Sequence, residues 1–162
     1  MEKRDLYDEN RNLIGKTIYK DEIIPEDNYI LVVIIFMENN DGRFLIQKRS
    51  LNKNGKWATT GGHPKSGEDS FSGLITEVKE ELGIDISNEN IILVDTKIGK
   101  NMICDIYYVK MNIDLDKIVI QKEEVSDVKL ASISEIDEMI NNNEFHKTHG
   151  MIFKDLMRYL SK

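Results

Sequence analysis

Three glutamates, Glu77, Glu80 and Glu81, are spaced so that a helix would carry their carboxylates on one face. Residues three and four positions apart are neighbours on a helix surface, with Cβ atoms about 5–6 Å apart, and like charges there repel. Glu80 and Glu81 also precede Gly83, the residue expected to end the helix, so they lie at the negative end of the helix dipole. A divalent cation would reverse both penalties, and carboxylate oxygens suit Mg²⁺ or Mn²⁺. The competing interpretation is a solvated acidic helix face that binds nothing.

The helix that must position these glutamates is predicted over residues 69–82. At about 100° per residue, a second set of side chains forms an apolar stripe that is expected to face the core. This stripe consists of Phe71, Leu74, Ile75, Val78 and Leu82. A glycine-rich loop precedes the helix and carries a further acid, Glu68. The loop and the helix together form the most informative segment of the chain.

The remaining elements indicate a layered α/β domain with a mixed sheet, because strands lie before and after the first helix and two helices follow them. Strands are predicted over residues 29–37, 44–48, 91–98, 102–111 and 128–130, and further helices over 134–141 and 148–160. The first of these strands is apolar throughout and rich in β-branched residues, which is typical of a strand covered on both faces. An N-terminal extension over residues 1–27 reads as a hairpin with too little apolar surface to fold alone. We therefore expect a single domain over 1–162.

Composition narrows the classes of function. The 162 residues carry 29 Asp and Glu against 22 Lys and Arg, a net charge of −7, which argues against a nucleic-acid polymer as partner. A single cysteine, Cys104, excludes a disulfide framework and a multi-cysteine zinc site, and we expect it to be a core residue rather than a nucleophile. No targeting segment is visible, and the longest apolar run is far shorter than the ~20 residues of a membrane-spanning helix. A cytoplasmic protein without a membrane partner is the expectation.

The segment Gly62–Ile84, called the box from here on, resembles the signature of the Nudix family, G-x5-E-x7-R-E-U-x-E-E-x-G-U, in which U is a bulky aliphatic residue. Glu68, the three helix glutamates, Gly83 and the aliphatic positions all match. One specified position differs, because Thr76 stands where the family has arginine. The strand before the segment, 44–49, and the lead-in 55–57 also resemble the family.

The resemblance implies an α/β/α sandwich around a mixed sheet and hydrolysis of the pyrophosphate bond in a small diphosphate substrate, assisted by Mg²⁺ or Mn²⁺. It implies that the metal is held by Glu77, Glu80 and Glu81, with Glu68 as a supporting ligand or partner. A further acid often comes from a later loop, and here Glu124 is preferred over Glu123. Either Glu77 or Glu124 would then be the general base that takes a proton from the attacking water. Substrate contacts are expected at Gly62, His63, Arg49 and Trp57.

Thr76 leaves a second class of function open. In the family the arginine pairs with a box glutamate, and threonine cannot supply that charge. Lys65 or Lys79 could compensate in part, although lysine lacks the planar fork of arginine. The alternative to a hydrolase is therefore a catalytically weak binding or regulatory module that senses a nucleotide or a sugar diphosphate.

Isopentenyl-diphosphate isomerase is a further alternative, since residues 8–16 and 57–64 are similar to segments of that enzyme. Its cysteine is replaced by Gly61, however, and no histidine precedes His63 to form its metal site. The isomerase is therefore disfavoured. His146 and His149 lie three apart near the start of the last helix, where capping or surface placement is favoured over metal ligation. The sequence does not determine the substrate or the oligomeric state. A homodimer is expected only because homodimers occur in the family that the chain resembles.

Overall fold

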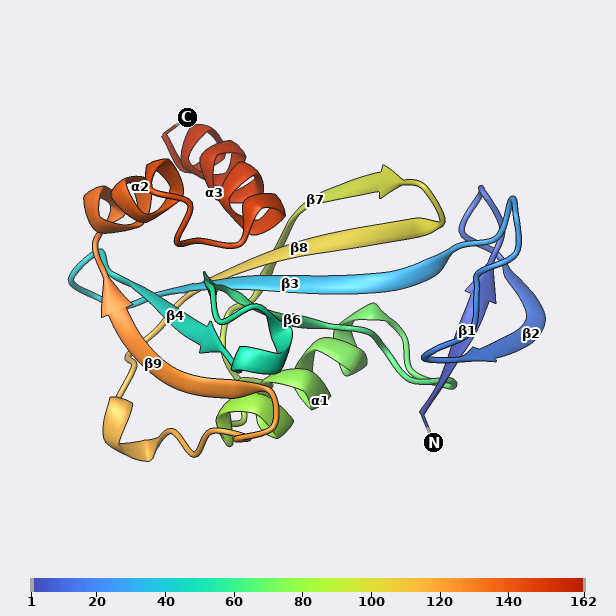
Figure 1. Cartoon of the computed structure of the whole chain (residues 1–162), viewed down its shortest axis with the longest axis horizontal. Helices are drawn as coiled ribbons and strands as arrows, with labels where there is room; N and C mark the ends of the chain where they lie inside the picture. Colours follow the sequence, from blue (N-terminus) through green and yellow to red (C-terminus); the bar gives the residue numbers. More distant parts are fainter. Residues whose placement is uncertain (1, 162) are drawn as a thin grey trace.

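The computed structural model of the chain describes residues 2–161 and is organised around a mixed β-sheet (Figure 1). The strand order is β5-β4-β3-β8-β7, with β6 paired to β3 and β9 paired to β4. The strands are β3 (Ile30–Glu38), β4 (Phe44–Arg49), β5 (Trp57–Ala58), β6 (Thr60–Gly62), β7 (Ile92–Gly99), β8 (Met102–Lys110) and β9 (Val125–Ala131). The central strand β3 is parallel to β8 and antiparallel to β6, so the expectation of a mixed sheet is confirmed.

Helices cover both faces of the sheet, as Figure 1 shows. Helix α1 (Ser70–Leu82) lies on one face, whereas α2 (Ile133–Asn141) and α3 (Lys147–Leu160) lie on the other. Strand β3 alternates between the two cores. Its residues Val33, Ile35 and Met37 pack with the apolar face of α1, and Ile34 and Phe36 pack with α2 and α3. This explains why the strand is apolar throughout, and it confirms the expected α/β/α sandwich.

Local capping signals determine where the helices begin and end. The Asp69 side chain accepts a hydrogen bond from the Ser72 backbone N–H, and Gly83 ends α1 with a φ of 70°. Ser132 and Glu135 form a capping box at the start of α2. His146 caps α3, because its side chain accepts a hydrogen bond from the His149 N–H. Capping was the role favoured for this histidine over metal ligation.

Three details differ from the sequence predictions. Strands β5 and β6 were not predicted, since two or three residues are too short to show a period. Strand β9 begins at Val125 rather than at residue 128. Phe71, placed on the core stripe, is 43% exposed and meets Tyr107 in an edge-type ring contact with centroids 6.4 Å apart. Cys104 is buried in the core, as expected.

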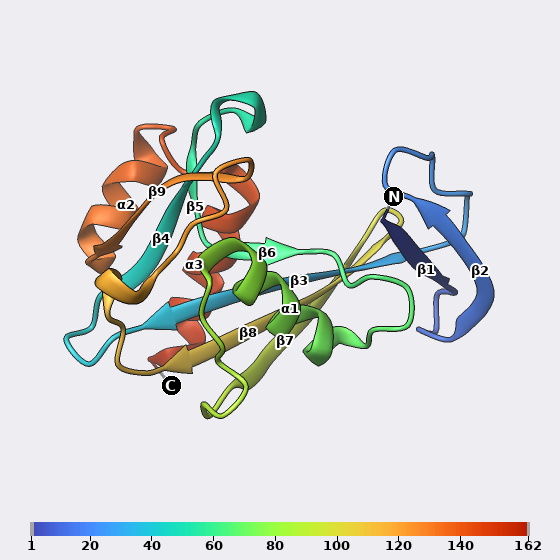
Figure 2. The ribbon, with the colours of Figure 1, turned by 90° about the horizontal axis from the view of Figure 1, so that it is seen from below.

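The N-terminal hairpin consists of β1 (Lys3–Tyr7) and β2 (Leu13–Tyr19), which form a separate two-stranded sheet (Figure 2). It packs against the start of β3 through a small cluster that contains Leu6, Ile18 and Ile30. The body of the protein therefore covers one part of the hairpin's apolar surface, while Leu13 and Tyr19 stay exposed. No helix among residues 2–161 has the length and apolar character needed to cross a membrane.

Candidate active site

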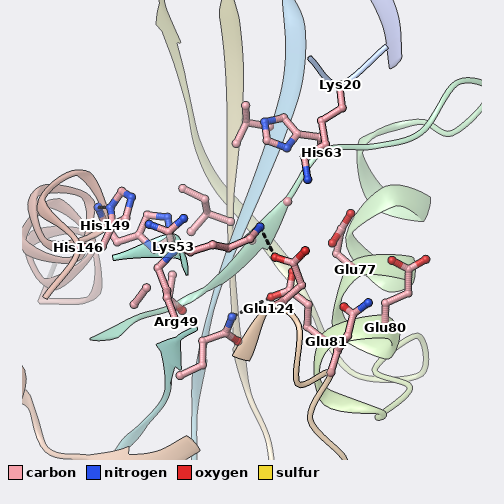
Figure 3. A pocket seen from close by; sticks show the side chains of 18 of the residues that line it. Lys20, Arg49, Lys53, His63, Glu77, Glu80, Glu81, Glu124, His146 and His149 are labelled. Atoms are coloured by element: carbon pink, nitrogen blue, oxygen red, sulfur yellow. Dashed lines mark hydrogen bonds and ion pairs between the residues drawn. The ribbon is translucent and has the colours of Figure 1, made fainter. Parts of the chain in front are cut away.

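A cavity of about 340 Å³ opens between α1, the middle of the sheet, the N-terminal hairpin and the start of α3 (Figure 3). Five carboxylates line it, from Glu77, Glu80 and Glu81, from Glu124, and from Glu2 just before the hairpin. The first three come from α1, as their spacing predicted. The expected substrate contacts Gly62, His63 and Arg49 also line the cavity. Most of the predicted site residues are therefore brought together in one place.

Glu77 and Glu81 are the buried members of this group, 9% and 8% exposed. The Gln47 side chain donates a hydrogen bond of 2.7 Å to Glu81 Oε1 and accepts one of 2.7 Å from Thr60 Oγ1. Burial, followed by the nearby Glu81 carboxylate, raises the pKa of Glu77 to about 8. Burial also raises the pKa of Glu81. Without a cation, this pair therefore retains a proton near neutral pH.

The other three carboxylates pair with lysines, and Glu2 Oε1 lies 3.9 Å from Lys65 Nζ. Lys65 Nζ lies 2.8 Å from Glu80 Oε1, and Lys53 forms an ion pair with Glu124 (Figure 3). Glu124 reaches the cavity because its loop is tied to the end of α1, where the Gln121 N–H donates to the Glu81 carbonyl at 3.0 Å. Its neighbour Glu123 does not line the cavity. The preference for Glu124 over Glu123 thus agrees with this geometry.

The donor set fits a hard divalent cation, although its side chains are not already arranged as a ligand shell. Within residues 2–161, no group of three or more His, Cys, Asp or Glu side chains is close enough to hold a metal ion. Instead, three of the carboxylates lie beside lysines, and burial raises the pKa of the other two. Because Mg²⁺ or Mn²⁺ bound by several carboxylates would replace these proton and lysine partners, the chemistry of the donors suits such an ion.

Gly62 is required by the position of Glu77. A Cβ atom at residue 62 would lie 2.3 Å from Glu77 Cδ and 2.5 Å from Oε2, far inside van der Waals contact. The Glu77 carboxylate therefore rests directly on the backbone of β6. This close approach is a physical reason for glycine at the first position of the box.

Glu68 is not brought into the cavity, so the proposed role as a metal ligand does not follow from this geometry. Its two oxygens are used within the loop, where Oε1 accepts from the Lys65 N–H at 2.7 Å and Oε2 accepts from Thr76 Oγ1 at 2.7 Å. Thr76 thus supplies a neutral hydrogen bond to a box glutamate at the position where the family has a charged arginine. The Lys65 ammonium does not replace that charge at Glu68, because it pairs with Glu80.

Trp57 is also outside the cavity, so its expected role in substrate binding stays a prediction. Its ring packs against the core cluster on the α2 and α3 face, and Lys129 Nζ lies 4.6 Å from the ring centre. The reason is register: Trp57 pairs with Lys48 in the sheet, so its ring points to the covered side. His63, in contrast, lines the cavity, and burial, followed by the nearby Arg4, Lys20 and Lys53, lowers its pKa to about 4.

Several cavity residues were missed by sequence reasoning. These are Arg4, Lys20, Gln47, Lys53, His146 and His149. Gln47 had a detectable signal, since it is a polar residue in the apolar strand Phe44-Leu-Ile-Gln, on the face that meets α1. Arg4 and Lys20, the cations of the hairpin, had no detectable signal, because nothing in their local sequence distinguishes them from other surface charges.

Comparison with known proteins identifies the family. The NUDIX domain family model matches residues 28–155. An uncharacterised Nudix hydrolase of Listeria monocytogenes is 31% identical over 150 residues, which are 90% of this chain and 88% of the relative. The chain therefore belongs to the Nudix family of pyrophosphohydrolases, whose members act on small diphosphate substrates and generally use divalent metals.

Solved structures agree with this fold. A protein of Deinococcus radiodurans superimposes with a TM-score of 0.74 at 19% identity, covering 89% of this chain and 91% of the other. The NUDIX domain of Shewanella oneidensis NrtR, crystallised with ADP ribose, has a TM-score of 0.64 at 17% identity and covers 82% and 88% of the two chains. At these identities the likeness concerns the fold alone.

The raised pKa of Glu77 has a consequence for stability without metal. Between the ordinary pKa of 4.5 and the folded value of about 8, the folded chain binds more protons than the unfolded chain. Stability is therefore lost as the pH rises through 8, and we expect the free energy of unfolding in EDTA to fall by about 1 kcal/mol between pH 7 and 9. Urea denaturation at several pH values measures this. His63 and His149, with pKa values lowered to about 4 and about 3, act only below this window.

Two controls isolate the contribution of Glu77. The Glu77→Gln variant lacks the titrating group, so its stability is expected to change less over the same range. Mg²⁺ is expected to flatten the wild-type profile by replacing the proton. A wild-type stability in EDTA that rises from pH 7 to 9 would contradict the assignment.

The Thr76 hydroxyl is expected to contribute to folding. Thr76→Val keeps the shape of the side chain but removes the hydrogen bond to Glu68, so the free energy of unfolding should fall by about 1 kcal/mol. The matched control is Thr76→Ser, which keeps the hydroxyl. Equal stability of the valine variant and the wild type in urea would show that this bond does not hold the loop.

Proposed function

We propose that the protein is a Mg²⁺- or Mn²⁺-dependent hydrolase that cleaves the pyrophosphate bond of a small nucleoside-diphosphate-linked or related substrate by attack of water on phosphorus. The observation that carries this proposal is the convergence of five carboxylates, two of them buried, on one cavity of a Nudix fold. Burying two acids side by side is costly for folding alone, and a cation that binds a diphosphate would offset that cost.

The proposed roles follow from the surroundings of each residue. Glu77, Glu80 and Glu81 would hold the cation, which when bound neutralises diphosphate charge and lowers the pKa of coordinated water. Gln47 orients Glu81 through its amide. Glu68 would hold the box loop in place through its hydrogen bonds to the Lys65 N–H and Thr76 Oγ1. Of its two expected roles, we therefore propose the supporting partner rather than the metal ligand.

Glu77 and Glu124 remain the two candidates for the general base. Each can accept a proton only in its ionised form. Lys53 forms an ion pair with Glu124 in the free protein, and a diphosphate that draws Lys53 away would leave that carboxylate free to accept a proton. A cation beside Glu77 would favour its ionised form in the same way.

A diphosphate-binding regulatory module is the second candidate, and the observation that favours it is the neutral Thr76 contact. The isomerase alternative is not supported, because Gly61 lacks a side chain for proton transfer. Like Gly62, it also has no room for one, since a Cβ would lie 2.7 Å from the Val33 carbonyl.

The deciding experiment is an activity screen with Mg²⁺ and with Mn²⁺ over nucleoside triphosphates, nucleotide sugars, ADP ribose, dinucleotides and isopentenyl diphosphate. Metal-dependent release of phosphate or a nucleotide product, abolished by EDTA, is expected for at least one compound. Tight binding of a compound without turnover would favour the regulatory module and overturn the hydrolase proposal.

The wider context of the protein is also proposed. We infer that residues 1–162 form a single domain that includes the hairpin, and that the protein acts in the cytoplasm on a small molecule rather than on nucleic acid. The net charge of −7 supports the last point. A homodimer is the assembly that family habit favours, and sedimentation analysis would test it.

A further inference from the structure

The N-terminal hairpin is joined directly to the box loop. The Ser66 N–H donates to the Lys3 carbonyl at 2.8 Å, and the Asp5 carboxylate accepts from Ser66 Oγ at 2.7 Å and from the Gly67 N–H at 2.9 Å. These contacts link β1 to the loop that leads from Gly62 into α1. The position of the hairpin is therefore coupled to the position of the candidate active site.

A second anchor holds the far end of the hairpin. The guanidinium of Arg11 meets the Asp105 carboxylate of β8 through two nitrogens, one of them at 2.9 Å, and Thr96 Oγ1 donates to the same carboxylate at 2.7 Å. Asp105 is buried at 1% exposed, whereas the Arg11 side chain is 39% exposed, so the carboxylate is the buried half of this charge-assisted pair. With an anchor at each end, the hairpin is a fixed wall rather than a loose extension.

This wall places two cations at the cavity, Arg4 from β1 and Lys20 from the end of β2, and the adjoining Glu2 carboxylate lies 3.9 Å from Lys65 Nζ. Figure 3 shows Lys20 beside His63, on the opposite side of the cavity from Glu80 and Glu81. Within residues 2–161, neither cation has a carboxylate within 4.0 Å, whereas Lys53 and Lys65 are both paired.

Arg4 has a further unmet requirement. Its Nε atom is buried and has no hydrogen-bond partner in the described part of the chain. A buried donor on a charged group is costly when it is unpaired, so its presence here points to an acceptor that arrives with a ligand. Burial, followed by the nearby Arg4, Lys20 and Lys53, lowers the pKa of His63, which agrees with the position of these cations at the cavity.

We propose that Arg4 and Lys20 form an anion subsite that binds phosphate oxygens of the substrate and makes the hairpin a determinant of specificity. The inference builds on the proposed function, since it assigns the substrate a second set of contacts away from the carboxylates. The matched family model begins at residue 28, so both cations lie outside that segment. The glutamates of α1 would bind the divalent cation, and Arg4 and Lys20 would bind phosphate oxygens of the diphosphate that this cation accompanies.

Titration of the metal-free protein with inorganic pyrophosphate in EDTA tests the subsite, because without a cation the carboxylates repel the anion. Isothermal calorimetry at low salt would compare wild type with Arg4→Gln, Lys20→Gln and the double variant. Each single substitution is expected to weaken binding about tenfold, and the double substitution more, because charge-assisted hydrogen bonds are lost. Lys16→Gln is the matched control, since Lys16 is exposed on the same hairpin and does not line the cavity.

The outcomes separate this inference from the proposed function. Wild type that binds no pyrophosphate, or a double variant that binds as tightly as wild type, would overturn the subsite even if hydrolysis is found. Binding that depends on both cations would support it even if no compound in the screen is turned over. Where turnover is found, the double variant is expected to raise KM at least tenfold with little change in kcat. Equal melting temperatures of the variants would show that the hairpin remains folded.

Discussion

The Glu77→Gln variant is expected to lose activity by about 10²–10⁴-fold in kcat/KM, the range for removal of a general base or a comparable catalytic carboxylate. Gln is close to Glu in shape, so the fold should persist while the charge is lost. Glu77 is buried beside Glu81, and the cation would need both carboxylates. The loss should therefore appear in kcat, together with a higher Mg²⁺ concentration for half-maximal rate.

Stability is expected to change in the opposite direction. In EDTA at pH 8, replacing the buried acid by a neutral amide removes the cost of ionising Glu77, and the melting temperature should rise by a few degrees, equivalent to about 1 kcal/mol. Higher stability with lower activity is the signature of a residue retained for chemistry rather than for folding.

The control for Glu77→Gln is Glu123→Gln, which makes the same change in net charge at an exposed acid outside the cavity. This variant should keep its activity within about twofold and its melting temperature within a degree or so. If Glu77→Gln retained full turnover and unchanged Mg²⁺ dependence, Glu77 would be neither a metal ligand nor the base. Glu124→Gln would then be the next variant to compare.

The Gly62→Ala variant is expected to lower kcat by about 100-fold while leaving the fold largely intact. The new methyl group would lie 2.3 Å from Glu77 Cδ, so the carboxylate must move. A shift of roughly 1 Å in a catalytic group is sufficient for a loss of this size. Because the displaced atoms are the end of a flexible side chain, the clash can be relieved without moving backbone.

Gly99→Ala provides the comparison for Gly62→Ala. At residue 99 the nearest atom to an added Cβ is 3.7 Å away, in Met102, which is ordinary contact. This variant should therefore keep full activity. Parallel measurements of kcat and of the melting temperature would separate the two substitutions, and a fully active Gly62→Ala variant would show that Glu77 need not rest against β6.

The chemistry of the α1 face could be predicted from sequence because it depends on local geometry. Helix periodicity places Glu77, Glu80 and Glu81 together whatever surrounds them. The capping residues Asp69 and Gly83 act on their own helix, so the limits of α1 could also be predicted. Glu124 could be predicted only through the family resemblance, since a contact between a helix and a loop some 40 residues later leaves no periodic trace.

The directions of the Glu68 and Trp57 side chains could not be predicted from the sequence. Glu68 lies in the box, yet the fold turns its carboxylate to Lys65 and Thr76 rather than to the cavity. Trp57 precedes the box by a few residues, yet its register in the sheet turns the ring to the covered face. Proximity in sequence did not decide either orientation, because one residue of register in a strand reverses the side to which a side chain points.

The sequence by itself determined the class of chemistry, since acids at helical spacing behind a glycine-rich loop are costly unless a cation joins them. The tertiary structure decided which charges face that cation and which do not. Arg4 and Lys20 reach the cavity only because the hairpin is anchored at Ser66 and at Asp105. Such contacts join residues about 60 and 94 positions apart, and long-range packing, rather than any local propensity, holds them together.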